Sequence, residues 1–149
     1  MTRSKVTRAA IGSAVAALIV VGAGCLESIA PKPSSIDLAG SWNYTGLQTG
    51  QVRETLSGML TISGESGSTF QGRLDILSVN TQTGLARTLG GLVSGAQSKS
   101  NLIDFDANLE ATPRRHVGQI VADTMSGTWV GSASDGSIIS GTFRAERSQ

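Results

Sequence analysis

Residues 125–143 read MSGTWVGSASDGSIISGTF and contain one pattern twice. An apolar residue, any residue, Gly, any residue and a second apolar residue follow one another in Met125–Trp129 and again in Ile139–Phe143. Such alternation places the apolar side chains on one face of a half-buried strand. Asp135-Gly136, between the two copies, is typical of a hairpin turn. The stretch therefore predicts two antiparallel strands joined by a tight turn.

The same pattern occurs earlier, in Leu38–Trp42, Leu56–Leu60 and Phe70–Leu74. In all these strands Gly falls on the buried face, where its missing Cβ permits the bends of a sheet that closes on itself. Abundant Gly on that face also favours some space inside. We expect an all-β fold, a small antiparallel up-and-down barrel of about eight strands. A β-sandwich would use the same alternation and remains the alternative.

The sequence pattern predicts some of the remaining strands and turns and leaves others open. Gly64–Gly67 is expected to separate the second and third strands, and Thr112–Arg114 the fifth and sixth. Leu77–Arg87 fits a longer loop, a strand extension or a short helix. Arg115–Ala122 is expected to be a strand, but its inward face is not determined by the pattern.

The first 25 residues have the layout of an export signal. Arg3, Lys5 and Arg8 precede an apolar run from Ala9 to Val21, and Gly22-Ala23-Gly24-Cys25 follows. This layout resembles the lipobox of bacterial lipoproteins. The resemblance implies a lipid on the Cys25 thiol, cleavage before that residue and anchoring to a membrane. In a Gram-negative host, Leu26 after the cysteine implies the outer membrane. In other hosts the implied location is the outer face of the cell membrane.

Two other outcomes at this signal stay open. Cleavage after Ala23 would leave Cys25 as a free thiol, and an uncleaved signal would anchor the chain itself. Cys25 is the only cysteine, so it has no intramolecular disulfide partner. The apolar run is shorter than the roughly 18 residues of a spanning helix.

We divide the chain into a signal peptide (1–24), a lipidated cysteine with a flexible tether (25–37) and one β-barrel domain (38–149). The 149 residues carry 12 Lys and Arg against 11 Asp and Glu. Because three of the basic residues lie in the signal, the mature chain is slightly acidic. We therefore expect no nucleic-acid partner.

Gly40-Ser41-Trp42 at the start of the first strand resembles the Gly-x-Trp signature of the calycins, the lipocalins and avidins. The resemblance implies that Trp42 closes one end of the barrel under a basic side chain from near the last strand. Arg144 and Arg147 are the two candidates. A second Gly-x-Trp occurs as Gly127-Thr128-Trp129. The longer lipocalin motifs and the avidin biotin site are not present.

Charged clusters give weaker signals. Asp104 and Asp106 share one strand face and are interpreted as solvent-facing. Arg114-Arg115-His116 is interpreted mainly as a solvated hairpin, with contact to an anionic lipid head or a carboxylate ligand as the alternative. His116 is the only histidine, and no Gly-x-Ser-x-Gly elbow is present, so we expect no catalytic residues, no metal, no cofactor and no enzymatic activity.

Two functions remain after these exclusions. The first is a lipid-anchored envelope protein whose lipocalin-like barrel binds a small apolar ligand. The second is a structural or assembly lipoprotein that binds an envelope protein and no small molecule. For the first function, we expect aromatic side chains to line the cavity that holds the ligand. These are Trp42, Tyr44, Phe70, Phe105, Trp129 and Phe143.

Overall fold

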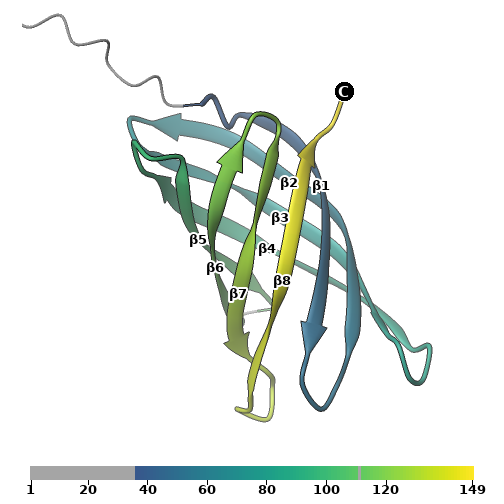
Figure 1. Cartoon of the computed structure of the whole chain (residues 1–149). Coiled ribbons are helices and arrows are strands. Elements are labelled where there is room, and N and C mark those ends of the chain that lie inside the picture. Colours follow the sequence, from purple (N-terminus) through teal and green to yellow (C-terminus); the bar gives the residue numbers. More distant parts are fainter. Residues whose placement is uncertain (1–35, 111) are drawn as a thin grey trace, which may run out of the picture. The chain divides into compact units, whose positions relative to one another are not determined.

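The computed structural model describes residues 36–110 and 112–149, and they form a closed eight-stranded antiparallel barrel (Figure 1). Each strand pairs with the next, and β8 pairs with β1. This closure confirms the predicted barrel and rules out the sandwich. The predicted signal peptide, Cys25 and most of the predicted tether lie outside the described residues. The strands are β1 (Gly40–Thr49), β2 (Glu54–Ser66), β3 (Thr69–Asn80), β4 (Ala86–Gln97), β5 (Leu102–Leu109), β6 (Thr112–Val121), β7 (Thr124–Ser132) and β8 (Ile138–Arg147).

The barrel has two distinct ends. End A contains the start of β1, the last residues of β8 and the β2–β3, β4–β5 and β6–β7 connections. End B contains the β1–β2, β3–β4, β5–β6 and β7–β8 connections. In the part of the chain that the structure describes, no helix is long and apolar enough to cross a membrane.

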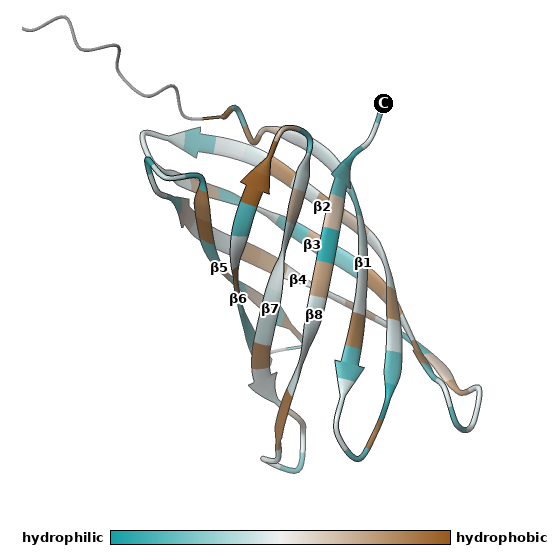
Figure 2. Cartoon of the chain, in the orientation of Figure 1, coloured by the Kyte–Doolittle hydropathy of each residue, from teal (hydrophilic) through white to brown (hydrophobic). Residues whose placement is uncertain are grey.

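Buried and exposed residues alternate along the strands as the sequence predicts. Figure 2 shows how hydrophobic and hydrophilic residues are distributed along the same strands. In β5, Ile103, Phe105, Ala107 and Leu109 are buried, whereas Asp104 and Asp106 face outward. The Asp104 carboxylate accepts a 2.6 Å contact from the Arg115 guanidinium on that outer face, which lowers the pKa of Asp104. The interpretation of this pair of carboxylates as solvent-facing is confirmed.

Glycines on the inner face allow neighbouring strands to approach closely. A Cβ added to Gly127 would lie 2.1 Å from the carbonyl oxygen of Val117, and one on Gly72 would lie 2.1 Å from that of Thr61. Close strand approach therefore requires these glycines, while their predicted link to sheet curvature stays a prediction. The expectation that they leave space inside is wrong at these positions, because the backbone of the adjacent strand occupies that space.

The structure assigns one stretch that the sequence left open and corrects one predicted turn. Leu77–Asn80 extends β3, Thr81–Leu85 forms the connection, and Ala86 begins β4. Thr112–Arg114 is not a turn but the first part of β6. Pro113 is tolerated there because it lies one residue from the start of the strand, where little of the ladder depends on its missing N–H.

Trp42 and Arg147 close end A. The two residues are paired in register across β1 and β8, and the guanidinium carbon lies 4.3 Å from the centre of the indole ring. Arg147 donates to the carbonyl oxygens of Asp37 and Ala39, and Trp42 Nε1 donates to the carbonyl oxygen of Leu38 at 2.9 Å. Arg147 is therefore the basic partner that the calycin resemblance implies, and the outward-facing Arg144 is not.

Candidate functional site: the polar end of the barrel

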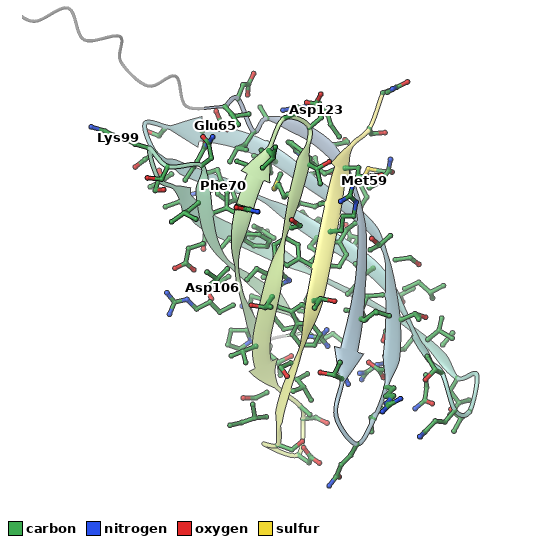
Figure 3. The ribbon with its side chains drawn as sticks, in the orientation of Figure 1. Met59, Glu65, Phe70, Lys99, Asp106 and Asp123 are labelled. Atoms are coloured by element: carbon green, nitrogen blue, oxygen red, sulfur yellow. The ribbon has the colours of Figure 1, made fainter. Side chains whose placement is uncertain are left out.

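All six aromatic residues singled out from the sequence are buried in the barrel interior (Figure 3 labels Phe70). Five of them pack on one another or on His116, whereas Trp42 packs under Arg147 at end A. Phe105 contacts Phe70 edge-on, with ring centres 6.0 Å apart, and stacks on the His116 ring at 4.4 Å. Tyr44 stacks on Phe143 at 6.1 Å. These rings fill the middle of the barrel, so access from solvent has to come from one of its ends.

End B differs from the apolar middle because polar side chains take inward positions there. Each takes an inward position of its strand near end B, and four of the five are buried. Arg87 lies at the rim and is half exposed. We call this set the polar ring: Gln48 of β1, Glu54 of β2, Ser78 of β3, Arg87 of β4 and Arg114 of β6.

Three of the five residues of the polar ring form hydrogen bonds or ion pairs with one another. The Ser78 hydroxyl donates to Glu54 Oε2 at 2.7 Å, and Arg87 Nη2 lies 3.3 Å from both carboxylate oxygens of Glu54. The buried Glu54 charge is therefore compensated by a hydrogen bond and by an ion pair, as burial of a carboxylate requires.

The other two residues of the polar ring, Gln48 and Arg114, have buried polar atoms without a hydrogen-bond partner. Arg114 is only 4% exposed, yet its Nε and Nη1 have no hydrogen-bond partner. Its guanidinium carbon lies 4.8 Å from the centre of the Trp129 ring, and Trp129 Nε1, in a side chain 2% exposed, also has no partner. Burial lowers the pKa of Arg114, with a smaller contribution from the nearby Arg87 charge.

Two glycines make room for these large side chains. An added Cβ on Gly131 would lie 2.9 Å from Arg114 Cγ, and one on Gly141 would lie 2.7 Å from Trp129 Cε2. Gly141 pairs with Trp129 on one side and with Gln48 on the other. Arg114, Trp129 and Gln48 thus lie on one side of the interior, spread over β6, β7, β8 and β1.

Below the ring, Tyr44 and His116 form a neutral hydrogen-bonded pair. His116 Nδ1 lies 2.9 Å from the carbonyl oxygen of Arg114, which can only accept, so Nδ1 carries the proton. His116 Nε2 then accepts from the Tyr44 hydroxyl at 3.1 Å. Burial lowers the pKa of His116 to about 4 and raises that of Tyr44. Both side chains are therefore uncharged at neutral pH.

This arrangement corrects the interpretation of Arg114-Arg115-His116 as a solvated hairpin. Only Arg115 faces outward, where it pairs with Asp104. Arg114 and His116 point into the barrel because β6 begins at Thr112, which gives even-numbered residues the inward positions. The cluster therefore supplies one cation to the interior and one to the surface.

Sequence reasoning missed Gln48, Glu54 and Ser78. The signal was present, because each continues the inward alternation of its strand by one step beyond the last apolar residue or glycine. Among residues 36–110 and 112–149, no group of His, Cys, Asp and Glu side chains could hold a metal ion.

A surface depression lies elsewhere, on the outer face of β6, β7 and β8. It is an open groove of about 500 Å³, and Val117 and Val130 line it with about half of each side chain exposed. Most of its lining residues face outward, and the inward-facing Trp129 and Gly141 also border it.

The architecture defines the class of the protein as a closed eight-stranded antiparallel β-barrel. No protein-family model and no curated protein sequence matches the chain. Among solved structures it is similar to EF1p2_mFAP2b bound to DFHBI, with a TM-score of 0.60, 12% identity, and coverage of 74% of this chain and 94% of that one.

Two further barrels are similar. The redesigned β-barrel mFAP0 bound to DFHBI has a TM-score of 0.53 and 16% identity, with 74% of this chain and 98% of that one covered. A de novo designed fluorescence-activating β-barrel has a TM-score of 0.52 and 17% identity, with 74% and 93% covered. At these identities the likeness establishes the fold alone.

Proposed function

We propose that this protein is a lipid-anchored binding protein of the cell envelope, whose barrel takes up a small, largely apolar molecule through end B. The observation that carries the proposal is the set of buried polar atoms without partners at that end, on Arg114, Trp129 and Gln48. Buried polar groups in folded proteins are nearly always hydrogen-bonded, and four unpaired atoms gathered at end B favour a ligand there. Near end A only Gln97 Nε2 lacks a partner among the buried polar atoms of the described residues.

Access from end B is supported by the burial pattern. Among the fully buried apolar side chains of the core, Leu89 and Phe143 at 4% and Ile76 at 3% keep the largest exposure. Ile76 and Leu89 are paired in register close to the end-B ends of β3 and β4. End A, by contrast, is closed by Trp42 and Arg147. The ligand would contact the polar ring with its polar group and this apolar wall with its body.

The fold is compatible with such a role. An eight-stranded barrel encloses an interior that holds side chains or one small ligand. Two of the similar barrels, EF1p2_mFAP2b and mFAP0, were solved with DFHBI bound. The role is binding without catalysis and requires no cofactor.

The envelope location rests on the sequence. The basic head, the apolar run and Cys25 favour lipidation of the cysteine thiol and anchoring through the attached lipid. The barrel would then be held at the outer membrane of a Gram-negative host, or at the outer face of the cell membrane in other hosts.

Native mass spectrometry of the full chain, purified from a bacterial host, tests the binding role. We expect a mass excess that disappears on denaturation and corresponds to a small molecule. A chain with the same mass in native and denatured spectra, and with no small molecule in a solvent extract, would contradict the proposal.

The outer groove favours a second candidate function, that of a structural or assembly lipoprotein. Half-exposed Val117 and Val130 beside Arg115 offer an apolar surface with one charge, as protein contacts do. A photo-crosslinking residue at Val130 would then give a discrete adduct with one envelope protein in cells. The same residue at Leu92, which is exposed on β4, is the control. Equal labelling from both positions would contradict this function.

A further inference from the structure

The unpartnered atoms at end B define what kind of molecule would satisfy them. Three are donor nitrogens, Arg114 Nε, Arg114 Nη1 and Trp129 Nε1, and one is an acceptor, Gln48 Oε1. The orientation of the Gln48 amide is fixed because its Nε2 donates to the carbonyl oxygen of Val52 at 3.2 Å. The side chains are 2–5% exposed, so bulk water does not satisfy these atoms.

The two ends of the barrel provide an internal comparison. At both ends an arginine lies over a tryptophan of a Gly-x-Trp sequence, Arg147 over Trp42 and Arg114 over Trp129. At end A, Arg147 donates to two carbonyl oxygens and to the Asp123 carboxylate, and the indole N–H has its own acceptor. At end B the equivalent nitrogens have no acceptor from the protein. An acceptor at end B therefore has to come from another molecule.

The charge at end B indicates that this acceptor is an anion. Within the polar ring two guanidinium groups, Arg87 and Arg114, face one carboxylate, Glu54, which is already bonded to Ser78 and Arg87. His116 beneath the ring is neutral. Glu110, exposed in the β5–β6 connection, attracts Arg114 at longer range but forms no ion pair with it. The ring thus has one positive charge without a partner at bonding distance.

We propose that the molecule bound at end B is a small organic acid whose carboxylate accepts hydrogen bonds from Arg114 and Trp129, and whose hydroxyl or amide N–H donates to Gln48. This inference rests on the proposed function and specifies its ligand class. A single carboxylate matches the one uncompensated charge. A phosphate monoester would bring a charge of about −1.5 to −2 at neutral pH and leave part of it buried without a partner.

The size of the effect follows from the burial of the groups. A hydrogen bond between charged groups in a desolvated site is worth about tenfold to a hundredfold in affinity. A ligand that lacks the carboxylate would leave the Arg114 and Trp129 nitrogens unsatisfied, and the site would discriminate against it by that factor. The hydroxyl that Gln48 requires would similarly favour hydroxy acids over plain acids.

Calorimetric titration of the full, detergent-solubilised chain tests the inference after any co-purified molecule has been dialysed away. The probes are salicylate, mandelate and 3-hydroxydecanoate, each beside its neutral methyl ester. We expect at least one acid to bind about tenfold or more tightly than its ester. Arg114→Gln should remove this preference, whereas Arg115→Gln, the outward-facing neighbour on the same strand, should leave it unchanged.

The inference is overturned if no acid binds more tightly than its ester, or if Arg115→Gln weakens the acid as much as Arg114→Gln does. The comparison of acid with ester uses the unmodified chain, so it stands even if Arg114→Gln does not fold. Esters that bind as tightly as acids, or a neutral co-purified molecule, would overturn the inference while leaving the proposed function intact. If no acid or ester binds and the purified chain carries no small molecule, both fail.

Discussion

The guanidinium carbon of Arg114 lies 4.8 Å from the centre of the Trp129 ring, inside the barrel. Arg114 Nε, Arg114 Nη1 and Trp129 Nε1 have no hydrogen-bond acceptor. Stacking of guanidinium on indole is favourable, more so when desolvated, but it does not replace the hydrogen bonds that burial removes. The pair is therefore held in place by packing over Gly131 and Gly141 while its polar edges remain free. Buried side chains with unpartnered polar atoms lower stability, and they are expected at functional sites, where a ligand can supply the missing partners.

Replacing Arg147 with Met should destabilise the barrel by about 1–3 kcal/mol, because the stacking on Trp42 and the bonds to the carbonyl oxygens of Asp37 and Ala39 are lost. Urea unfolding measures the difference. Arg144→Met is the matched control, since Arg144 forms an exposed ion pair with Glu146 and its loss should cost less than about 1 kcal/mol. Equal losses in the two variants would show that Arg147 does not close end A.

Replacing Gly127 with Ala should destabilise the fold by more than about 2 kcal/mol, or prevent folding, because the added Cβ would lie 2.1 Å from the Val117 carbonyl oxygen. Gly64→Ala provides the control, because nothing lies within 4 Å of the Cβ position there. That change should alter stability by no more than about 0.5 kcal/mol. Similar unfolding midpoints for the two variants would refute the role of inner-face glycines in strand approach.

Stability should fall in mild acid because of His116. Burial lowers its pKa from 6.5 to about 4, so between these values the unfolded chain binds a proton that the folded chain does not. The contribution is fully present above pH 6.5 and is lost as the pH falls towards 4, by about 3 kcal/mol. Urea unfolding at pH 7 and pH 4.5 measures it. His116→Gln should flatten this pH dependence, and an unchanged slope in that variant would assign the effect to other groups.

Cys25→Ser should abolish lipidation. In cells fed a labelled fatty acid, the unmodified chain is expected to carry the label and the variant to lack it. The intact mass of the unmodified chain should correspond to residues 25–149 plus the lipid. Label retained in Cys25→Ser, or an unlipidated chain that begins at Gly24 as cleavage after Ala23 predicts, would reject the lipoprotein hypothesis.

Much of the fold could be predicted because one physical rule dominates it. A strand with one buried face alternates with a period of two, and the repeated Gly-centred pattern marks that alternation in β1, β2, β3, β7 and β8. The choice of a barrel over a sandwich depended on the same glycines. The structure explains why, since their missing Cβ atoms are where adjacent backbones meet.

The polar end could be predicted only in part. Pro113 suggested a turn, which concealed the start of β6 and therefore the inward direction of Arg114 and His116. Gln48, Glu54 and Ser78 lie far apart in the chain, and each by itself is an unremarkable polar residue near a strand end. Only the register of eight strands brings them to one rim, and a register of that kind depends on long-range pairing that local patterns do not specify.

The most direct test of ligand binding at end B uses the two indole N–H resonances of the protein. Nuclear magnetic resonance spectra would compare the ¹⁵N-labelled full chain as purified with the same chain after removal of its bound molecule by unfolding and refolding. Because Trp129 Nε1 lacks a partner in the barrel and Trp42 Nε1 donates to Leu38, we predict that only the Trp129 resonance moves. A Trp129 resonance that stays at the same position in both samples would contradict binding at end B.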